Sequence, residues 1–243
     1  MECRVSPRRI FFPLLVCMLT SAAGAFGASP ADVQMLHPGT IQARTAACAA
    51  CHGVQGQGTD NDYFPRLAGK PAGYLFNQLK NFRDGRRRYP QMNYLMTYMS
   101  DDYLHQIADY FSSQRPPYPA PETPVVSDAT VDYGKQLVYQ GDPSRNIPAC
   151  AACHGAHLMG TEPGIPGLVG LHSDYISAQL GAWRSGVRHA NAPDCMQQIA
   201  TRLTTRDVSA VAAWLSSQQA PANPQPDAAP KGKLPLVCGS EPQ

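Results

Sequence analysis

A six-residue unit, Cys48-Ala49-Ala50-Cys51-His52-Gly53, is repeated without change as Cys150-Ala151-Ala152-Cys153-His154-Gly155. The two copies lie 102 positions apart in a chain of 243 residues. A turn of the form Pro-x-Leu-x-Gly recurs at nearly the same spacing, at residues 65–69 and 166–170. A period this long, present twice, indicates a duplicated domain rather than a solenoid. The length also agrees with about two domains.

The repeated unit predicts a specific chemistry. Two cysteines three positions apart, followed at once by a histidine, form the attachment motif of a c-type haem. A zinc site and a redox dithiol are the alternatives, but zinc-binding pairs normally lie within about 15–20 residues, and a dithiol does not need the histidine. The residues expected to hold two covalently bound haem c groups are Cys48, Cys51, Cys150 and Cys153, and those expected to bind the iron are His52 and His154.

The methionines supply candidates for the other iron ligand. The second copy contains only Met159 and Met196, and Met159 follows the haem-binding histidine too closely to reach the opposite face. Met196 lies eight residues before Thr204, an expected helix cap, and Met92 lies eight residues before the equivalent Ser100. This register favours Met92 and Met196 as iron ligands. The alternative is that each methionine only packs against its neighbours.

A histidine and a methionine together would fill both axial positions of each iron. Such an iron has a raised potential and suits electron transfer rather than substrate binding. The carbonyl groups of Pro65 and Pro166 are candidates to orient His52 and His154. The remaining methionines of the first copy, Met96 and Met99, are expected in the core or in a loop.

The N-terminus has the layout of a secretory signal peptide. Three arginines precede an apolar stretch at residues 10–19, and small residues follow at 22–28, with cleavage expected between Ala25 and Ala28. The apolar stretch is too short to span a bilayer, so an uncleaved anchor is the less favoured alternative. We therefore expect a periplasmic protein.

The expected fold is all-α, with two tandem domains joined by a Pro-rich linker. Apolar residues recur with helical spacing from Leu104 to Phe111 and from Val208 to Leu215. Further helices are expected at about residues 74–82 and 175–183, each ending at a glycine. The expected organisation is a signal peptide over 1–28, a first domain over 29–115, a linker over 116–127, a second domain over 128–219 and a Pro-rich tail over 220–243.

Two cysteines of the mature chain lie outside the haem motifs. Cys195 adjoins Met196, and Cys238 lies in the tail. In an oxidising compartment a leftover pair predicts a disulfide, which would hold the tail across the second methionine loop. A bond to another subunit is the alternative.

Composition limits the partners. The formal net charge is +2, which gives no case for nucleic-acid binding. Only 16% of residues are charged and 43% are hydrophobic, which argues against global disorder. The run Arg86-Arg87-Arg88 just before Met92 is either a solvated loop or a docking patch for an acidic redox partner.

On these motifs, the chain resembles the dihaem class I c-type cytochromes of the cytochrome c4 type over about residues 39–219. The resemblance implies two tandem class I cytochrome c domains, related by a pseudo-twofold axis, with adjacent haems and axial ligands at Met92 and Met196. It also implies a periplasmic shuttle feeding a terminal oxidase. The tail from Ala220 onwards departs from the simplest members and favours a subunit or partner-docking role.

Three functions are therefore considered. The leading one is an electron carrier with two low-spin His/Met haems and no catalytic residues. The alternative is the cytochrome subunit of a periplasmic dehydrogenase. An enzyme, such as a peroxidase or a thiosulfate-oxidising dihaem protein, would need an open or unusually ligated iron. The expected partners are a cytochrome bc complex or a dehydrogenase as donor and a terminal oxidase as acceptor. No nucleic acid is expected, and peripheral membrane association is left open.

Overall fold

The computed structural model describes residues 39–60, 63–230 and 232–241. The expected signal peptide and the first ten residues of the expected first domain lie outside these ranges. Among the described residues, no helix combines the length and apolarity needed to cross a bilayer.

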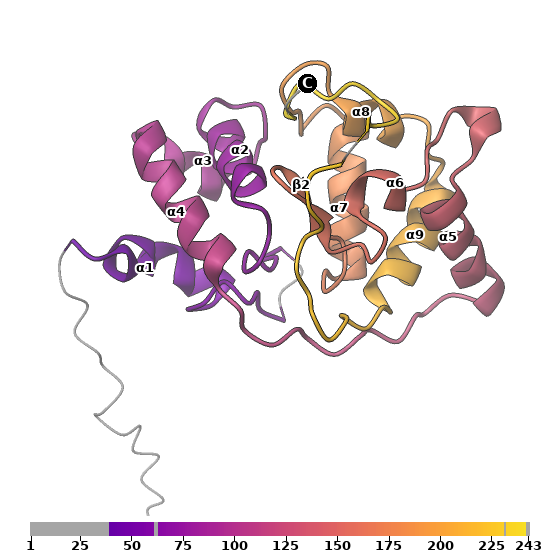
Figure 1. Cartoon of the computed structure of the whole chain (residues 1–243), viewed down its shortest axis with the longest axis horizontal. Helices are drawn as coiled ribbons and strands as arrows, with labels where there is room; N and C mark the ends of the chain where they lie inside the picture. Colours follow the sequence, from indigo (N-terminus) through magenta and orange to yellow (C-terminus); the bar gives the residue numbers. More distant parts are fainter. Residues whose placement is uncertain (1–38, 61–62, 231, 242–243) are drawn as a thin grey trace, which may run out of the picture. The chain divides into compact units, whose positions relative to one another are not determined.

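The first half of the described chain is helical (Figure 1). Its elements are α1 (Ile41–His52), α2 (Ala72–Arg83), α3 (Pro90–Met96) and α4 (Asp101–Ser113). Ser100 caps α4, as its position in the sequence predicts, because its side chain accepts a hydrogen bond from the Tyr103 backbone. The apolar stripe of α4 is buried against α2, which fixes the angle between these two helices.

The second half repeats this pattern and adds short elements around the second haem motif. It contains α5 (Asp128–Gln140), η2 (Pro143–Arg145), α6 (Ala151–His154), β1 (Gly160–Thr161), β2 (Ile165–Pro166), α7 (Ser173–Arg184), α8 (Cys195–Ala200) and α9 (Thr205–Ser216). The two strands form one antiparallel pair in which Gly160 lies opposite Pro166. The all-α expectation is confirmed, since this hairpin is the only sheet within the described ranges.

Helices α5 and α9 form the main packing contact of the second half. Gly134 of α5 lies against the backbone of α9, where a side chain would overlap the carbonyl oxygen of Ala210. Thr204 and Asp207 form the capping box expected at the start of α9. The buried Asp207 carboxylate also accepts hydrogen bonds from Tyr133 (2.7 Å) and Arg145 (2.6 Å), which ties α9 to α5 and η2.

The Pro-rich linker is packed along both halves. The Arg66 guanidinium donates to the carbonyls of Pro116 (2.6 Å) and Pro117 (2.8 Å) and lies 3.9 Å from the ring centre of Tyr118. On the other side, the Glu122 carboxylate accepts hydrogen bonds from His172 Nδ1 and from the Ser173 backbone. The linker therefore fixes the two halves to each other.

The halves also meet through equivalent backbone segments. Arg88 N donates to Val187 O at 3.0 Å, and His189 N donates to Arg86 O at 2.7 Å. Because residues 86–88 and 187–189 occupy matching places after Gly85 and Gly186, each bond maps onto the other when the halves are exchanged. This exchange is what the expected pseudo-twofold relation requires.

Candidate functional site

The first haem motif opens into a cavity enclosed mainly by the first half. Cys48, Cys51 and His52 lie at the end of α1 and line this cavity together with Met92 of α3. His52 Nδ1 donates to the Pro65 carbonyl oxygen at 2.9 Å, which fixes the tautomer and the orientation of the ring. The other ring nitrogen, Nε2, is thereby left with the lone pair that a metal needs.

The second motif has the same construction. Cys150, Cys153 and His154 lie at α6 and line a second cavity together with Met196 of α8. His154 Nδ1 donates to the Pro166 carbonyl oxygen at 2.7 Å. The sequence-based prediction that these two proline carbonyls orient the histidines is confirmed in both copies.

The electrostatics of both sites favour a neutral imidazole and argue against a redox dithiol. Burial lowers the pKa of His52 and of His154, so each ring stays neutral as a metal ligand must be. Burial raises the pKa of the Cys150 thiol to about 11, and it also raises the pKa of Cys48. A catalytic dithiol needs a lowered thiol pKa, whereas thiols that become thioethers do not.

Each methionine that the repeat register favours as an iron ligand lines a haem cavity. Met92 and Met96 both line the first cavity, whereas Met196 lines the second. The position equivalent to Met96 in the second copy is Ala200, which is buried in the core. Met159 also packs in that core. The pair that occupies the same place in both copies is Met92 and Met196.

Two buried cations, Lys70 and Arg188, and the half-buried Arg87 lie where the two cavities approach each other. Lys70 and Arg188 line both cavities, and Arg87 lines the first. Burial lowers the pKa of Lys70 to about 8, and burial together with the Arg87 charge lowers the pKa of Arg188 to about 10. All three are therefore charged at neutral pH.

These cations bind neutral acceptors. Within the described residues, the side-chain oxygens of Gln78 and Gln179 each accept hydrogen bonds from both arginines, at 2.7–3.0 Å. Lys70 Nζ donates to the Gly167 carbonyl oxygen at 2.9 Å. A haem carries two propionate carboxylates, and cations that bind these neutral acceptors suit them. The residues present thus fit one haem per cavity: two thiols, an oriented histidine, a methionine and nearby cations.

From the sequence, Arg87 belongs to a solvated loop or a docking patch, and Lys70 and Arg188 have no assigned role. Gln78 and Gln179 are visible as repeated positions, but helical periodicity explains them equally well as packing residues. Lys70 and Arg188 carry no motif, because their partners come from the other half of the molecule.

Comparison with known proteins decides the family. A family model described as cytochrome c matches residues 39–114 and 131–219, which is more than half of the chain. This chain belongs to the cytochrome c family. Its two matched segments each contain one haem motif, so it is a dihaem c-type cytochrome with two covalently bound haem c groups.

Individual relatives refine the position of this dihaem cytochrome. It is 35% identical to the thiosulfate dehydrogenase electron acceptor of Thiomonas intermedia over 92% of this chain and 99% of the relative. It is 34% identical to cytochrome c4 of Pseudomonas aeruginosa over 83% of this chain and 94% of the relative. The crystal structure of reduced cytochrome c4 from Pseudomonas stutzeri superposes with a TM-score of 0.64 at 31% identity, covering 73% of this chain and 96% of that one. The expected cytochrome c4 type is thereby confirmed, and with it a function in electron transfer.

Proposed function

We propose that this dihaem cytochrome is a periplasmic electron acceptor for a dehydrogenase that oxidises thiosulfate. The observation that carries the proposal is the extent of the similarity. The match to the thiosulfate dehydrogenase electron acceptor runs beyond the two haem domains and covers 92% of this chain, compared with 83% for cytochrome c4 of Pseudomonas aeruginosa. The periplasmic location is supported by the expected signal peptide and by the use of haem c.

Each haem in this proposal has one histidine and one methionine ligand. The protein would supply His52 and Met92 to the first iron and His154 and Met196 to the second, with Pro65 and Pro166 holding the histidines. A haem iron with this ligand pair carries one electron and keeps no position for substrate. Two such sites together can take up the electron pair that a dehydrogenase releases.

A second candidate is a carrier between a cytochrome bc complex and a terminal oxidase. It is favoured by the similarity to cytochrome c4, which extends over both haem domains. The two candidates share the same haem chemistry and differ only in the donor.

The identity of the electron donor distinguishes the two candidate functions. Oxidised holoprotein is mixed with thiosulfate and a catalytic amount of purified thiosulfate dehydrogenase, and its haem spectrum is followed by stopped flow. We expect rapid reduction of both haems, dependent on the enzyme and on thiosulfate. A holoprotein that stays oxidised there, but is reduced rapidly by a quinol-oxidising bc complex, would replace the proposal with the second candidate.

A further inference from the structure

The two haem cavities differ in what encloses them. The second cavity is lined by four residues of the C-terminal tail, which are Leu236, Cys238, Ser240 and Glu241. The lining of the first cavity, among the described residues, comes only from residues 47–111 and from residues 174–188 of the second half. Within the described ranges, the tail therefore forms part of the wall of one haem site of a duplicated pair, and the other site has no equivalent segment.

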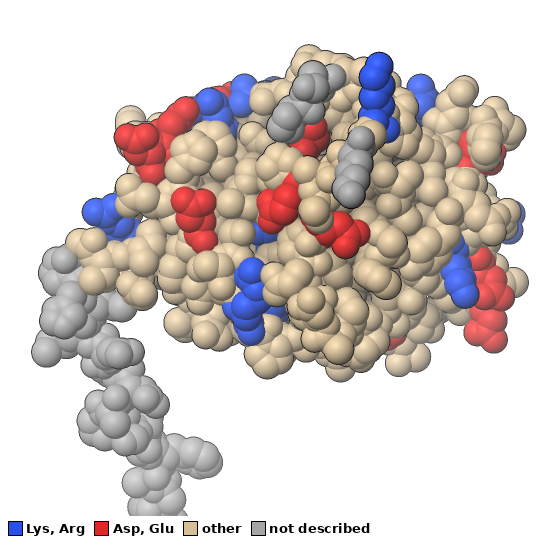
Figure 2. Space-filling model, viewed as in Figure 1, with Lys and Arg blue, Asp and Glu red and all other residues tan. Residues whose placement is uncertain are grey.

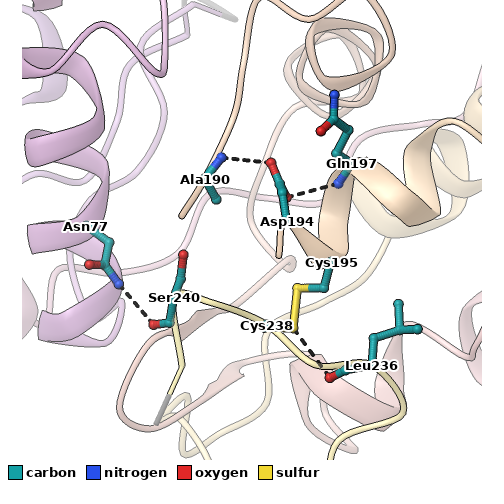
Figure 3. The surroundings of a disulfide bond; sticks show 8 residues. All are labelled: Asn77, Ala190, Asp194, Cys195, Gln197, Leu236, Cys238 and Ser240. Carbon is teal, nitrogen blue, oxygen red and sulfur yellow. Dashed lines mark hydrogen bonds between the residues drawn. A yellow bond between two sulfur atoms is a disulfide. The ribbon is translucent and has the colours of Figure 1, made fainter. Parts of the chain in front are cut away.

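The tail is held at both ends of the segment that covers the second site. Cys238 forms the expected disulfide with Cys195, with the two Cα atoms 5.1 Å apart (Figure 3). Next to it, Gly239 N donates to Pro193 O at 2.9 Å, and Asn77 of α2 donates to Ser240 O at 3.3 Å. The end of the tail is thus bonded to the methionine loop of the second half and to a helix of the first.

A second anchor lies further upstream, at Asp227. Its backbone pairs with the β1 hairpin, since Asp227 N donates to Gly160 O and Glu162 N donates to Asp227 O. Its carboxylate accepts a hydrogen bond at 3.2 Å from the backbone N of Ala156, two residues after the haem-binding His154. The tail consequently covers the side of the second site where the haem motif lies, and its Glu241 lines the second cavity together with Cys153.

The first half presents an apolar surface at the corresponding methionine loop. Tyr94 and Tyr98 have 82% and 97% of their surface exposed, and Leu95 between them is exposed and also lines the first cavity. We call Tyr94, Leu95 and Tyr98 the first-domain patch. Tyrosine is enriched in protein interfaces, and an exposed apolar cluster beside a redox site marks a surface for a partner.

The second copy lacks this patch. In the register set by the helix caps Ser100 and Thr204, Tyr94 corresponds to Gln198 and Tyr98 to Arg202. Both replacements are polar, and Arg202 donates to a backbone carbonyl of its own domain. The second haem site, which the tail lines, thus lacks the two tyrosines, and the first haem site carries them.

Charge does not provide an alternative docking surface at the arginine run. Arg87 is half-buried and donates to Gln78 and Gln179 of the two domains, and Arg86 is bonded to Asp84 and Asn81, which leaves Arg88 as the exposed member. On the face seen in Figure 2, basic and acidic groups are interspersed among uncharged residues. The hypothesis of a three-arginine docking patch is therefore not supported by the structure.

We propose that a protein partner exchanges electrons only with the first domain, over the first-domain patch, while the disulfide-held tail excludes it from the second haem. Electrons then reach and leave the second haem through the first haem. The partner is the dehydrogenase of the proposed function, docked through an apolar surface of its own. The inference rests on that proposal for the identity of the partner. Electron transfer slows steeply with distance, so a layer of chain over one haem site is enough to direct exchange to the other.

The test compares equivalent positions in the two copies. The variant Tyr94→Ser/Tyr98→Ser removes the aromatic surface, and Gln198→Ser/Arg202→Ser is its matched control. We expect the second-order rate of reduction by the dehydrogenase to fall at least tenfold in the tyrosine variant and less than twofold in the control. The rate with ascorbate, a small reductant, and both haem potentials should stay unchanged. Equal reduction rates in the two variants would rule out docking of the dehydrogenase at the first-domain patch.

The role of the tail is tested by releasing it in the tyrosine variant. Cys195→Ser/Cys238→Ser removes the disulfide, and Asp227→Ala loosens the other anchor without a change beside Met196. We expect at least one of these changes to raise the reduction rate of the tyrosine variant threefold or more, because the second haem becomes accessible. If neither change raises the reduction rate of the tyrosine variant, the tail does not keep the partner from the second haem.

Failure of the inference can be told from failure of the proposed function. If wild-type holoprotein accepts no electrons from thiosulfate dehydrogenase, the function is wrong and the same variants are measured with the bc complex as donor. If wild type accepts electrons and the tyrosine variant does so at the same rate, the function stands and the docking inference falls.

Discussion

The orientation of the haem-binding histidines is the residue-level feature that sequence predicts best. The Pro65 and Pro166 carbonyls follow their histidines at nearly the same distance along the chain, so duplication marks them even without a structure. The methionines are harder, because Met92 and Met96 are one helical turn apart and both line the first cavity. Only the second copy, where Ala200 stands at the place of Met96, separates them.

Replacing each proposed methionine ligand by alanine should change one haem and spare the other. In Met92→Ala or Met196→Ala, we expect loss of half of the red charge-transfer absorption that methionine-bound ferric haem gives, and a fall in the potential of one haem, since a thioether ligand raises it. The measurements are absorption spectroscopy and a redox titration of the holoprotein. Met96→Leu, which keeps volume in the same cavity, is the control and should keep the full band. A full band in Met92→Ala would rule out that ligand.

Among the elements, α2, α4, α7 and α9 follow from local signals, whereas the long helices α1 and α5 and the short elements do not. Ser100 and Thr204 start α4 and α9 where a hydroxyl precedes an apolar stripe, and both signals are contained in a few residues. In contrast, α3, α8 and the β1–β2 hairpin carry no such local signal. They are too short to be stable alone and depend on packing against other helices and on the tail.

The crossing of α5 and α9 depends on a glycine, and this can be tested against a second helical glycine. Gly134→Ala should lower the free energy of unfolding by about 2 kcal/mol, because the new methyl group overlaps the Ala210 carbonyl and the helices must separate. Gly181→Ala in α7 has open space around it, so it should raise stability by up to about 1 kcal/mol through helix propensity alone.

Urea unfolding of the two holoproteins, monitored by far-ultraviolet circular dichroism, gives both values. The two substitutions make the same chemical change in helices of the same domain, so their difference isolates the helix contact. If Gly134→Ala were as stable as Gly181→Ala, the close approach of α5 and α9 would not be a determinant of stability.

At the scale of the whole molecule, sequence predicts two domains and a disulfide but not the contact between the domains. The duplication and the leftover cysteine pair are countable in one chain, and both lead to the observed arrangement. The interface joins residues about 100 positions apart, and Arg87 and Arg188 look like surface residues until both halves are assembled. Their burial arises from tertiary packing, which no local pattern encodes.

The last prediction concerns the charge of the buried Arg188 and the potentials of both haems. Arg188 is 5% exposed, lines both cavities and carries a positive charge that water screens poorly. Because a positive charge disfavours the oxidised iron, Arg188→Leu should lower the potentials of both haems, by roughly 50 mV each. Arg184→Leu, the same change at the exposed end of α7, should shift them far less, since solvent screens that charge. Spectroelectrochemical titration measures both variants, and equal shifts in the two would show that the buried position of Arg188 does not set the potentials.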